Sequence, residues 1–371
     1  MLGKYIEPAL TDYFFYKASR ELRPLSGTFE LSPVCNFNCK MCYVHRKKSE
    51  LEAMGKKILP PSFWIDLAKK AADNGMLYLL LTGGEPFLYP GFKEVYDAVS
   101  RMGFVLSINS NGSLITDEWI EYLSQNPPSR INITLYGASD ETYERLCGIK
   151  NGYTKATRAI LKLKEAGICV KLNTSLTPLN VCDLDKIIDF SNEHKLILES
   201  ATYMFPPVRI NEDNKGKNVR FTPEQMALAD IKIHERQWPE TAFDKYIHDM
   251  NGRKCIIPGI DTQCSGNEGN ELLCRAGTAA FWTTWEGDIT PCGMLPVPRI
   301  SLLEHDFNDA WKLLVEETSK IRLAPECKEC ECIDICHSCA GMTYAENAEF
   351  SKPPKYLCEY TKAIVNICKE K

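Results

Sequence analysis

Short apolar segments alternate with amphipathic segments along the first half of the chain. The amphipathic segments predict helices, and Thr116 is placed to cap the third of them. Gly75, Gly103 and Gly167 stand where helix C-terminal caps belong. The apolar runs are rich in Val, Ile, Leu, Tyr or Thr and predict strands at Thr28–Val34, Met76–Thr82, Phe104–Asn109, Ile131–Tyr136, Cys169–Leu176 and Leu196–Phe205. The predicted helices are Pro61–Asn74, Gly91–Met102, Asp117–Ser124, Tyr153–Ala166 and Leu184–His194.

This alternation repeats about every 30 residues, which indicates parallel strands joined by right-handed crossovers. Six such units form an open, partial (β/α)6 barrel, because a closed eight-unit barrel needs roughly 250 residues. The pattern stops after Pro206–Pro207. Asn211–Asn218 is polar and charged, and Thr222 is expected to cap a helix that ends near Arg236. From Cys255 onward, elements are short and Gly, Pro and Cys are frequent, which is typical of a segment organised around metal centres.

The predicted fold class is therefore α/β: a partial barrel followed by a small, irregular, Cys-rich α+β domain. We expect an N-terminal extension (residues 1–27), the barrel (28–205), a bridging helical region (206–254), the Cys-rich domain (255–358) and a C-terminal helix (359–371).

Composition narrows the function classes. The chain has 371 residues, and its 44 basic and 49 acidic residues give a net charge of −5, which argues against a nucleic-acid partner. No segment approaches the roughly 18 apolar residues of a membrane span, and the start of the chain lacks the apolar core of a secretory signal. The 17 cysteines are therefore expected to be reduced thiols in the cytoplasm, used for metal ligation, redox chemistry or burial.

The cysteines are unevenly spread. Cys147, Cys169, Cys182 and Cys368 stand alone and are expected to be small buried hydrophobic residues. Cys35-x3-Cys39-x2-Cys42, in contrast, directly follows the first predicted strand, at the strand end where ligands bind in parallel α/β layers. Thiolates this close repel one another unless a metal centre neutralises them.

Three thiolates suit a cubane iron–sulfur cluster, because they hold three irons and leave the fourth open to a substrate or cofactor. A zinc site with His45 as the fourth ligand is the alternative.

The segment Cys35-Asn-Phe-Asn-Cys39-Lys-Met-Cys42 resembles the cluster-binding loop of radical S-adenosylmethionine (radical SAM) enzymes. In that family the open iron chelates SAM, and one electron cleaves SAM to a 5′-deoxyadenosyl radical. Met41 occupies a position that is usually aromatic in the family, and the resemblance implies that it contacts adenine. Thr82-Gly83-Gly84-Glu85-Pro86 resembles the family motif that binds the SAM amino group. Its glycines allow close approach of the backbone to a ligand, and a carboxylate pairs with an ammonium group.

Further residues are assigned through the same resemblance. Ser107, in Ser107-Ile-Asn-Ser-Asn111-Gly112, is similar to a family serine that contacts the ribose and carboxylate of SAM. Arg145 lies near the position of a carboxylate-binding arginine, although a surface arginine fits equally well. Leu176 is expected to line the adenine side or to pack in the core. Tyr136 is the candidate catalytic residue, which would position substrate or quench a radical, with simple packing as the other role.

The C-terminal cysteines resemble the SPASM extension of peptide-modifying radical SAM enzymes, which carries auxiliary [4Fe–4S] clusters. The spacing Cys336-His-Ser-Cys339 is one residue shorter than in the family, and Cys332 is extra. Zinc knuckles are the alternative for this segment. The resemblance implies one auxiliary cluster on Cys274, Cys292, Cys339 and Cys264 (or Cys255 in place of Cys264), and a second on Cys327, Cys330, Cys336 and Cys358. With the cluster at Cys35, Cys39 and Cys42, the implied cofactors are SAM and three [4Fe–4S] clusters.

The same resemblance implies hydrogen abstraction under anaerobic conditions from a ribosomally synthesised precursor peptide, to install a cross-link or other modification. About 27 residues precede the first predicted strand, so leader recognition is expected from a separate protein or from residues 206–250. One alternative is sulfatase maturation, whose enzymes carry a basic aspartate where Gly293 stands here. Modification of a tetrapyrrole or small molecule is another, and a non-catalytic electron carrier with several clusters is a third.

A basic loop lies beside the first cysteine group and comprises Lys40, His45, Arg46, Lys47 and Lys48. It is expected either to dock an acidic reductant, such as a flavodoxin or ferredoxin, or to be a solvated loop.

Overall fold

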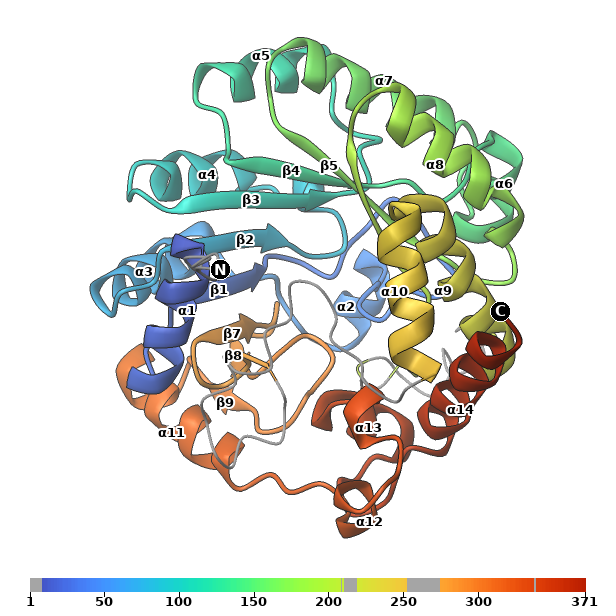
Figure 1. The fold of residues 1–371 in the computed structure, drawn as a ribbon. Coiled ribbons are helices and arrows are strands. Elements are labelled where there is room, and N and C mark those ends of the chain that lie inside the picture. The colour runs from blue at the N-terminus through green and yellow to red at the C-terminus, as the bar shows by residue number, and fades with distance from the viewer. Residues whose placement is uncertain (1–8, 208, 210–218, 252–273, 337) are drawn as a thin grey trace, which may run out of the picture.

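The computed structural model describes residues 9–207, 209, 219–251, 274–336 and 338–371 (Figure 1). Within these residues, nine strands form one sheet in the order β6-β5-β4-β3-β2-β1-β7-β8-β9, and β1 to β6 are parallel neighbours. The strands are β1 (Ser26–Glu30), β2 (Tyr78–Thr82), β3 (Val105–Ser110), β4 (Arg130–Thr134), β5 (Val170–Ser175), β6 (Ile197–Ala201), β7 (Ala280–Thr283), β8 (Asp288–Thr290) and β9 (Ile300–Ser301). The predicted partial barrel is confirmed.

Helices surround the sheet as an outer ring (Figure 1). Those of the barrel are α1 (Leu10–Glu21), α2 (Lys48–Ala53), α3 (Pro61–Asp73), α4 (Phe92–Ser100), α5 (Asp117–Gln125), α6 (Asp140–Cys147), α7 (Gly152–Glu165) and α8 (Leu184–Glu193), with the short 3-10 helices η1 (Pro86–Leu88) and η2 (Val181–Asp183). The later ones are α9 (Pro223–Gln237), α10 (Glu240–Asn251), α11 (Phe307–Ser319), α12 (Pro325–Lys328), η5 (Ile333–Ile335), α13 (Ala340–Asn347) and α14 (Lys355–Glu370).

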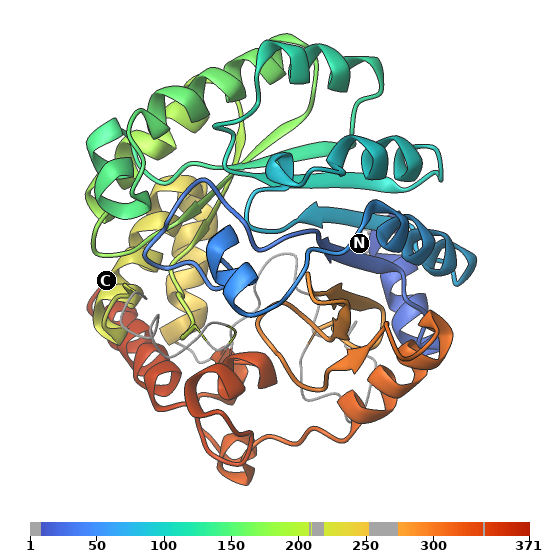
Figure 2. The same cartoon turned by 180° about the vertical axis from the view of Figure 1, so that it is seen from behind.

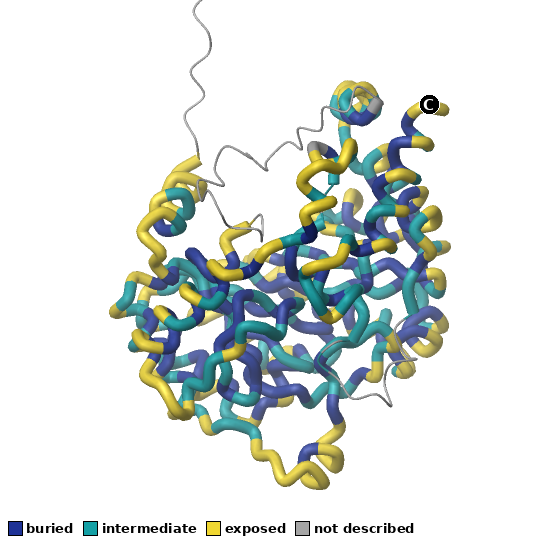
Figure 3. Tube along the Cα trace, turned by 90° about the horizontal axis from the view of Figure 1, so that it is seen from below, coloured by how far each residue is buried: buried dark blue, intermediate teal, exposed yellow. Residues whose placement is uncertain are grey.

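The two faces of the barrel sheet differ in polarity, because successive strand residues point to opposite sides. One set of alternate residues is apolar, fully buried and packed with the helices in the main core, for example Phe29, Leu81, Ile108 and Ile133. The other set faces the lumen and includes asparagines on three neighbouring strands. Figure 3 shows the resulting distribution, with buried residues inside and exposed residues on the outer helices.

Most local predictions from the sequence hold. Thr116 accepts a hydrogen bond from the Trp119 N–H (3.4 Å) and caps α5, and Thr222 forms a capping box with α9. Gly75, Gly103 and Gly167 have φ values of 95°, 81° and 78°, a region that favours glycine.

Four expectations are wrong in detail. The last strand of the barrel, β6, ends at Ala201 rather than Phe205. β1 ends at Glu30 rather than Val34, because the chain leaves the sheet after Leu31 bonds to Thr82 and turns toward the cysteine loop. Cys169 and Cys182 are exposed rather than buried: Cys169 lies in the connection before β5, and Cys182 lies in the middle of the short helix η2.

The Cys-rich segment joins the barrel directly. β7 pairs in parallel with β1, with Ser26 opposite Ala280, and β8 and β9 follow as antiparallel strands. Phe281 packs against Phe307 and Trp311 of α11 within the main core. The sheet thus runs without interruption from the barrel into the segment after residue 274.

Helices α9 and α14, in the last part of the chain, pack against helix α8 of the barrel. Phe221 and Met226, at the start of α9, pack against Leu184 and Ile188 of α8 and Leu357 of α14. The segment that carries α2 crosses the middle of the ring in both views (Figure 2). Among the described residues, no helix has the length and apolar character needed to cross a membrane.

Candidate active site

The three-cysteine loop leaves the carboxyl end of β1 and is held by backbone hydrogen bonds. Asn38 N–H donates to the carbonyl of Cys147 (2.9 Å), and Lys40 N–H donates to that of Leu146 (3.0 Å). These carbonyls belong to the last turn of α6, whose C-terminal carbonyls have no partner within the helix. α6, which the sequence pattern did not predict, therefore anchors the loop.

The three cysteines are partly buried and lie close enough to affect one another's pKa values. Burial raises the pKa of Cys35 and of Cys42, the latter to about 11, and the neighbouring cysteines raise both values further. A hydrogen bond with Cys147, followed by burial, raises the pKa of Cys39. Backbone N–H groups point at two of the sulfurs: Phe37 N–H at Cys35 Sγ and His45 N–H at Cys42 Sγ, each 3.3 Å away. Buried thiolates that repel one another but receive amide donors fit an iron–sulfur cluster, whose irons supply the missing positive charge.

In the part of the chain that the structure describes, no group of three or more His, Cys, Asp or Glu residues, the cysteine sets included, is arranged to hold one metal ion.

The Gly83–Gly84 turn packs against the chain that leads into the cysteine loop. A Cβ atom on Gly83 would lie 2.4 Å from Ser32 O, and one on Gly84 would lie 2.4 Å from Val34 O. Gly84 N–H donates to Ser32 O (2.7 Å), and Glu85 N–H donates to Val34 O (2.9 Å). The close approach that requires glycine here is therefore backbone to backbone, and it fixes the cysteine loop relative to β2.

Glu85 joins the ends of β2 and β3. Its carboxylate is fully buried and accepts hydrogen bonds from Ser110 Oγ (2.9 Å), Asn111 N–H (2.8 Å) and Phe87 N–H (3.2 Å). Burial raises the pKa of Glu85 to about 7, against the lowering effect of these donors. A carboxylate has about four acceptor positions, so most of its capacity is already used within the protein.

Asn111 connects β3 to the cysteine loop. Its Nδ2 donates to Asn36 Oδ1 (3.0 Å) and to Cys35 Sγ (3.7 Å), and only 7% of the residue is exposed. Sequence reasoning chose Ser107 from this segment, but Ser107 lies three residues before the end of β3. The signal that points to Ser110 and Asn111 is the strand end itself, where ligand-binding residues gather.

The barrel lumen below these residues is lined by amides. Asn132 Nδ2 on β4 donates to Asn109 Oδ1 on β3 (2.7 Å), which leaves Asn132 Oδ1 buried without a donor. Asn173 Oδ1 on β5 is also buried without a donor. A buried acceptor that lacks a partner is costly, so these atoms fit a bound polar molecule such as SAM, whose hydroxyl and amino groups are donors.

The other predicted cofactor residues lie at several places. Met41 is partly buried against the main core, and Leu176 is fully buried in the cluster that joins α8, α9 and α14. Arg145 is exposed on α6, and its guanidinium donates to the carbonyl of Leu179 (2.7 Å). Tyr136 forms a hydrogen bond with Cys39 that lowers the thiol's pKa, and burial raises the pKa of Tyr136. The Tyr136 hydroxyl is therefore beside a predicted cluster ligand.

A buried carboxylate at the end of β1 was not anticipated. Glu30 accepts two hydrogen bonds from Arg209, at 2.7 Å and 2.9 Å, and one from Trp282 Nε1 at 3.0 Å. Arg209 also lies over the ring of Tyr43, directly after Cys42. This group connects the cysteine loop, the bridging region and β7 at the mouth of the barrel.

The C-terminal cysteines fall into two sets. In the first, Cys292 Sγ and Cys339 Sγ lie 3.7 Å and 3.6 Å from the point where a Cβ of Gly341 would stand. Burial raises the pKa of Cys292 to about 11, and Cys339 and Cys274 raise it further. Cys264 and Cys255, the candidate upstream ligands, lie outside the described residues.

The second set surrounds Cys358 at the start of α14. Burial raises the pKa of Cys358, and Cys336, Cys327 and Cys330 raise it further, so these four sulfurs are neighbours. Cys332, by contrast, is partly buried against the apolar cluster of α9, α10 and α14. The structure thus brings together the members of each predicted ligand set that it describes.

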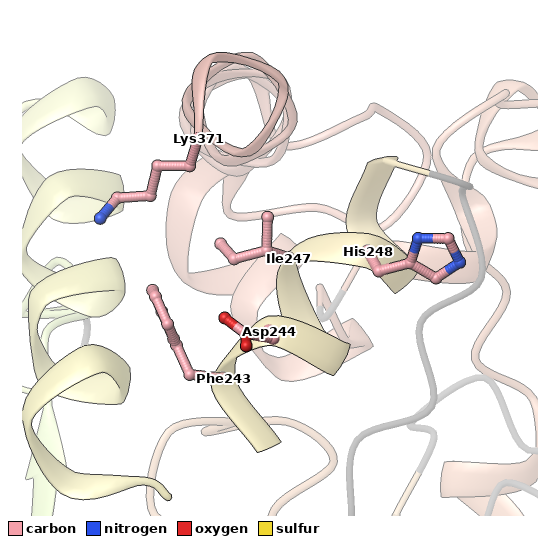
Figure 4. A pocket seen from close by; sticks show the side chains of 5 residues that line it. All are labelled: Phe243, Asp244, Ile247, His248 and Lys371. Carbon is pink, nitrogen blue, oxygen red and sulfur yellow. The ribbon is translucent and has the colours of Figure 1, made fainter. Parts of the chain in front are cut away.

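A separate pocket lies away from the cysteine motifs. It has a volume of about 430 Å³ and is lined by Phe243, Asp244, Ile247 and His248 of α10 and by Lys371 (Figure 4). None of these residues belongs to a cysteine motif or to a strand end, so the pocket is not the candidate active site.

Comparisons with known proteins agree with this geometry. The radical SAM superfamily model matches residues 29–191. The sporulation killing factor maturation protein SkfB of Bacillus subtilis (strain 168) is 26% identical over 310 residues, which cover 84% of this chain and 69% of SkfB. An AdoMet-dependent heme synthase of Methanosarcina barkeri (strain Fusaro / DSM 804) is 23% identical over 339 residues, which cover 90% of this chain and 95% of the synthase.

The fold also matches that of Streptococcus suis SuiB bound to its precursor peptide SuiA, with a TM-score of 0.66 at 18% identity over 96% of this chain and 83% of SuiB. The cysteine loop, the barrel and these matches together make the chain a radical SAM enzyme that resembles the peptide maturases with a C-terminal SPASM segment.

Proposed function

We propose that this radical SAM enzyme modifies a ribosomally synthesised peptide by abstracting hydrogen from one of its carbon atoms. The observation that carries the proposal is the hydrogen-bonded unit of Cys35, Asn111 and Glu85, which ties the cysteine loop to the ends of β2 and β3. The similarity to SkfB, a maturation protein, supports a peptide as the substrate. When bound, the cluster and SAM supply a 5′-deoxyadenosyl radical.

The residues of this chain would position that chemistry. Cys35, Cys39 and Cys42 would hold the cluster, and the asparagines of the lumen would receive donors from SAM. Because most of the Glu85 carboxylate is engaged, the SAM amino group would bind mainly to backbone carbonyls of the Gly83–Gly84 turn. Ser107, Arg145, Leu176 and Met41 remain further candidates for SAM contacts, and Tyr136 remains the candidate for contact with the substrate.

Two auxiliary [4Fe–4S] clusters complete the proposal. Cys274, Cys292 and Cys339 would hold the first, with Cys264 as the fourth ligand, and Cys327, Cys330, Cys336 and Cys358 would hold the second. The mutual effects of these thiols on their pKa values support the two sets. About 12 iron atoms per chain are expected for three such clusters.

One relative favours a second candidate function. The heme synthase of Methanosarcina barkeri is matched over 95% of its length, so a tetrapyrrole substrate is the main alternative. Sulfatase maturation is disfavoured at Gly293. A Cβ there would lie 3.0 Å from the ring of Trp282, so an aspartate does not fit without moving that ring.

The enzyme would need partners. We propose a flavodoxin or ferredoxin as reductant, a separate leader-binding protein, and an anaerobic cytoplasmic setting that keeps the thiols reduced. Lys40, Lys47 and Lys48 are exposed beside the cysteine loop and would attract an acidic reductant.

Anaerobic reconstitution with iron, sulfide, SAM and dithionite tests the proposal. We expect about 12 iron atoms per chain and release of 5′-deoxyadenosine, with deuterium transferred to it from a labelled precursor peptide. A variant in which Cys35, Cys39 and Cys42 are all replaced by alanine should keep the iron of the auxiliary clusters. It should release no 5′-deoxyadenosine. Absence of 5′-deoxyadenosine from the unmodified protein would exclude the enzyme, and deuterium transfer from a tetrapyrrole instead would redirect the substrate.

A further inference from the structure

Arg46 is a buried cation in a loop that the sequence predicts to be basic and exposed. Only 7% of Arg46 is exposed, whereas its neighbours Lys47 and Lys48 are exposed. Arg46 N–H donates to Pro33 O (3.0 Å), and the residue pairs with Val34. The chain that enters the cysteine loop therefore holds Arg46 in place.

Among the residues that the structure describes, the guanidinium of Arg46 has no ionic partner and forms no hydrogen bond. A buried charge without a partner is costly, and a guanidinium carries five N–H donors that need acceptors. The Arg46 side chain is therefore able to bind an anion that none of the described residues supplies.

The side chain lines a cavity of about 140 Å³, which we call the Arg46 pocket. Tyr43 and Arg46 reach it from the cysteine loop, Trp285, Glu286 and Arg299 from the Cys-rich segment, and Arg209 from the bridging region. The pocket thus lies between the chain that follows Cys42 and the stretch of the Cys-rich segment on either side of Cys292. Its volume is below the roughly 300–1,000 Å³ of a small-molecule site, and suits one side chain or one chain end.

Around the pocket, the described cationic side chains outnumber the described carboxylates by one. Arg209 pairs with Glu30 (2.7 Å), Arg299 pairs with Glu286 (2.7 Å) and with Asp288 (2.6 Å), and Lys56 pairs with Glu286. Among the described residues, three carboxylates thus face four cations, and Arg46 is the cation left without a counter-charge. A carboxylate is the anion that matches a guanidinium best, through two parallel hydrogen bonds.

We propose that the Arg46 pocket binds a carboxylate of the substrate peptide, so that the enzyme prefers substrates with an acidic group at a fixed distance from the reacting carbon. The inference rests on the proposed peptide substrate. A peptide fits better than the surface of a protein reductant, because a side chain that is 7% exposed is reached by a flexible extended chain and not by a folded surface.

Binding of four short peptides to the reconstituted protein with SAM bound tests the inference. The probes are acetyl-Gly-Gly-Glu-Gly-Gly-amide, its Gln analogue, acetyl-pentaglycine with a free C-terminus, and acetyl-pentaglycine amide. We expect the Glu probe to bind about tenfold more tightly than the Gln probe, since hydrogen bonds to charged groups are stronger. If acetyl-pentaglycine with a free C-terminus bound more tightly than the Glu probe, the pocket would instead be assigned to the peptide C-terminus.

Variants then connect this preference to Arg46. Arg46→Gln should abolish the difference between the Glu and Gln probes, and Arg46→Lys should keep part of it. Lys47→Gln removes the same charge from the exposed neighbour and should change the ratio less than twofold. Equal binding of the two probes to the unmodified protein would overturn the inference, even if Arg46→Gln failed to fold.

Two further results would overturn it separately. Loss of the Glu preference when SAM is added would assign the pocket to the carboxylate of SAM. An effect of Arg46→Gln on reduction by flavodoxin, without an effect on peptide binding, would assign it to the reductant. Release of 5′-deoxyadenosine is measured in the same preparation. Its absence would refute the proposed function, whereas release without probe discrimination would refute only the inference.

Discussion

Replacement of Gly84 by alanine tests whether the Gly-Gly turn serves the cysteine loop. The new Cβ would lie 2.4 Å from Val34 O and 2.6 Å from Pro33 O. Both are backbone atoms, so no side-chain rotation can relieve the contact. Restoring an ordinary separation of 3.4 Å requires that the turn and residues 33–34 move apart by about 1 Å.

The cost follows from that movement. Crowding of this kind destabilises proteins by about 1–3 kcal/mol, and loss of the Gly84 N–H bond to Ser32 O adds about 1 kcal/mol. We therefore expect the free energy of unfolding to fall by about 2–4 kcal/mol. Because residue 34 precedes Cys35, the displacement also passes into the cysteine loop and should reduce cluster occupancy.

The assay compares melting temperature and iron content under anaerobic conditions. Gly103→Ala is the matched control, because a Cβ at Gly103 meets nothing within 4 Å and the change costs only the strain of φ +81°. We expect Gly84→Ala to melt about 1–4 °C below the control and to lose iron from the first cluster. Equal melting temperatures and equal iron contents would refute the account of the turn.

Three further predictions concern buried polar groups. Glu30→Ala leaves Arg209 buried without its partner and should lower the free energy of unfolding by about 3–5 kcal/mol, measured by urea titration, whereas Glu316→Ala in an exposed pair should leave the urea midpoint unchanged. Glu85 has its pKa raised from 4.5 to about 7, so the stability it contributes is complete below pH 4.5 and is lost as the pH rises through 7. Because Glu85→Gln cannot titrate, the difference in free energy of unfolding between this variant and the unmodified protein should change by about 3 kcal/mol between pH 4.5 and 8. Asn111→Ala removes a donor to Cys35 Sγ and should lower the reduction potential of the first cluster in a titration followed by electron paramagnetic resonance.

Each of these predictions has a contradicting outcome. An unchanged urea midpoint for Glu30→Ala would mean that Arg209 reaches water or another carboxylate. A pH-independent difference for Glu85→Gln would mean that the carboxylate keeps its ordinary pKa in the folded protein. An unchanged potential for Asn111→Ala would show that its amide does not act on the cluster.

The barrel and its first motif were predictable from the sequence because both are local. The period of about 30 residues predicts β1 to β6 and their helices, and the spacing of Cys35, Cys39 and Cys42 indicates the cluster loop. Groups assembled from distant segments were not predictable. The carboxylate of Glu85 meets Ser110 and Asn111 only because β2 and β3 are neighbours.

Burial was the other quantity that the sequence pattern could not supply. Arg46 stands in a run of basic residues that has the composition of a solvated loop. Its burial depends on the tertiary structure, in which it pairs with Val34 and is packed by segments that are distant in sequence. Likewise, short strands after residue 274 carry too few residues for a periodic signal, so the position of β7 beside β1 depends on tertiary packing.

The pairing of β1 with β7 also sets an order of events during synthesis. One edge of β1 stays without its partner until residues 280–283 have left the ribosome, long after the other five parallel strands can form. An unpaired edge of a nascent sheet is a site for wrong pairing between chains. A fragment that stops before residue 280 would keep that edge open permanently, so the Cys-rich segment acts as an edge protector for the barrel as well as a carrier of sulfur ligands.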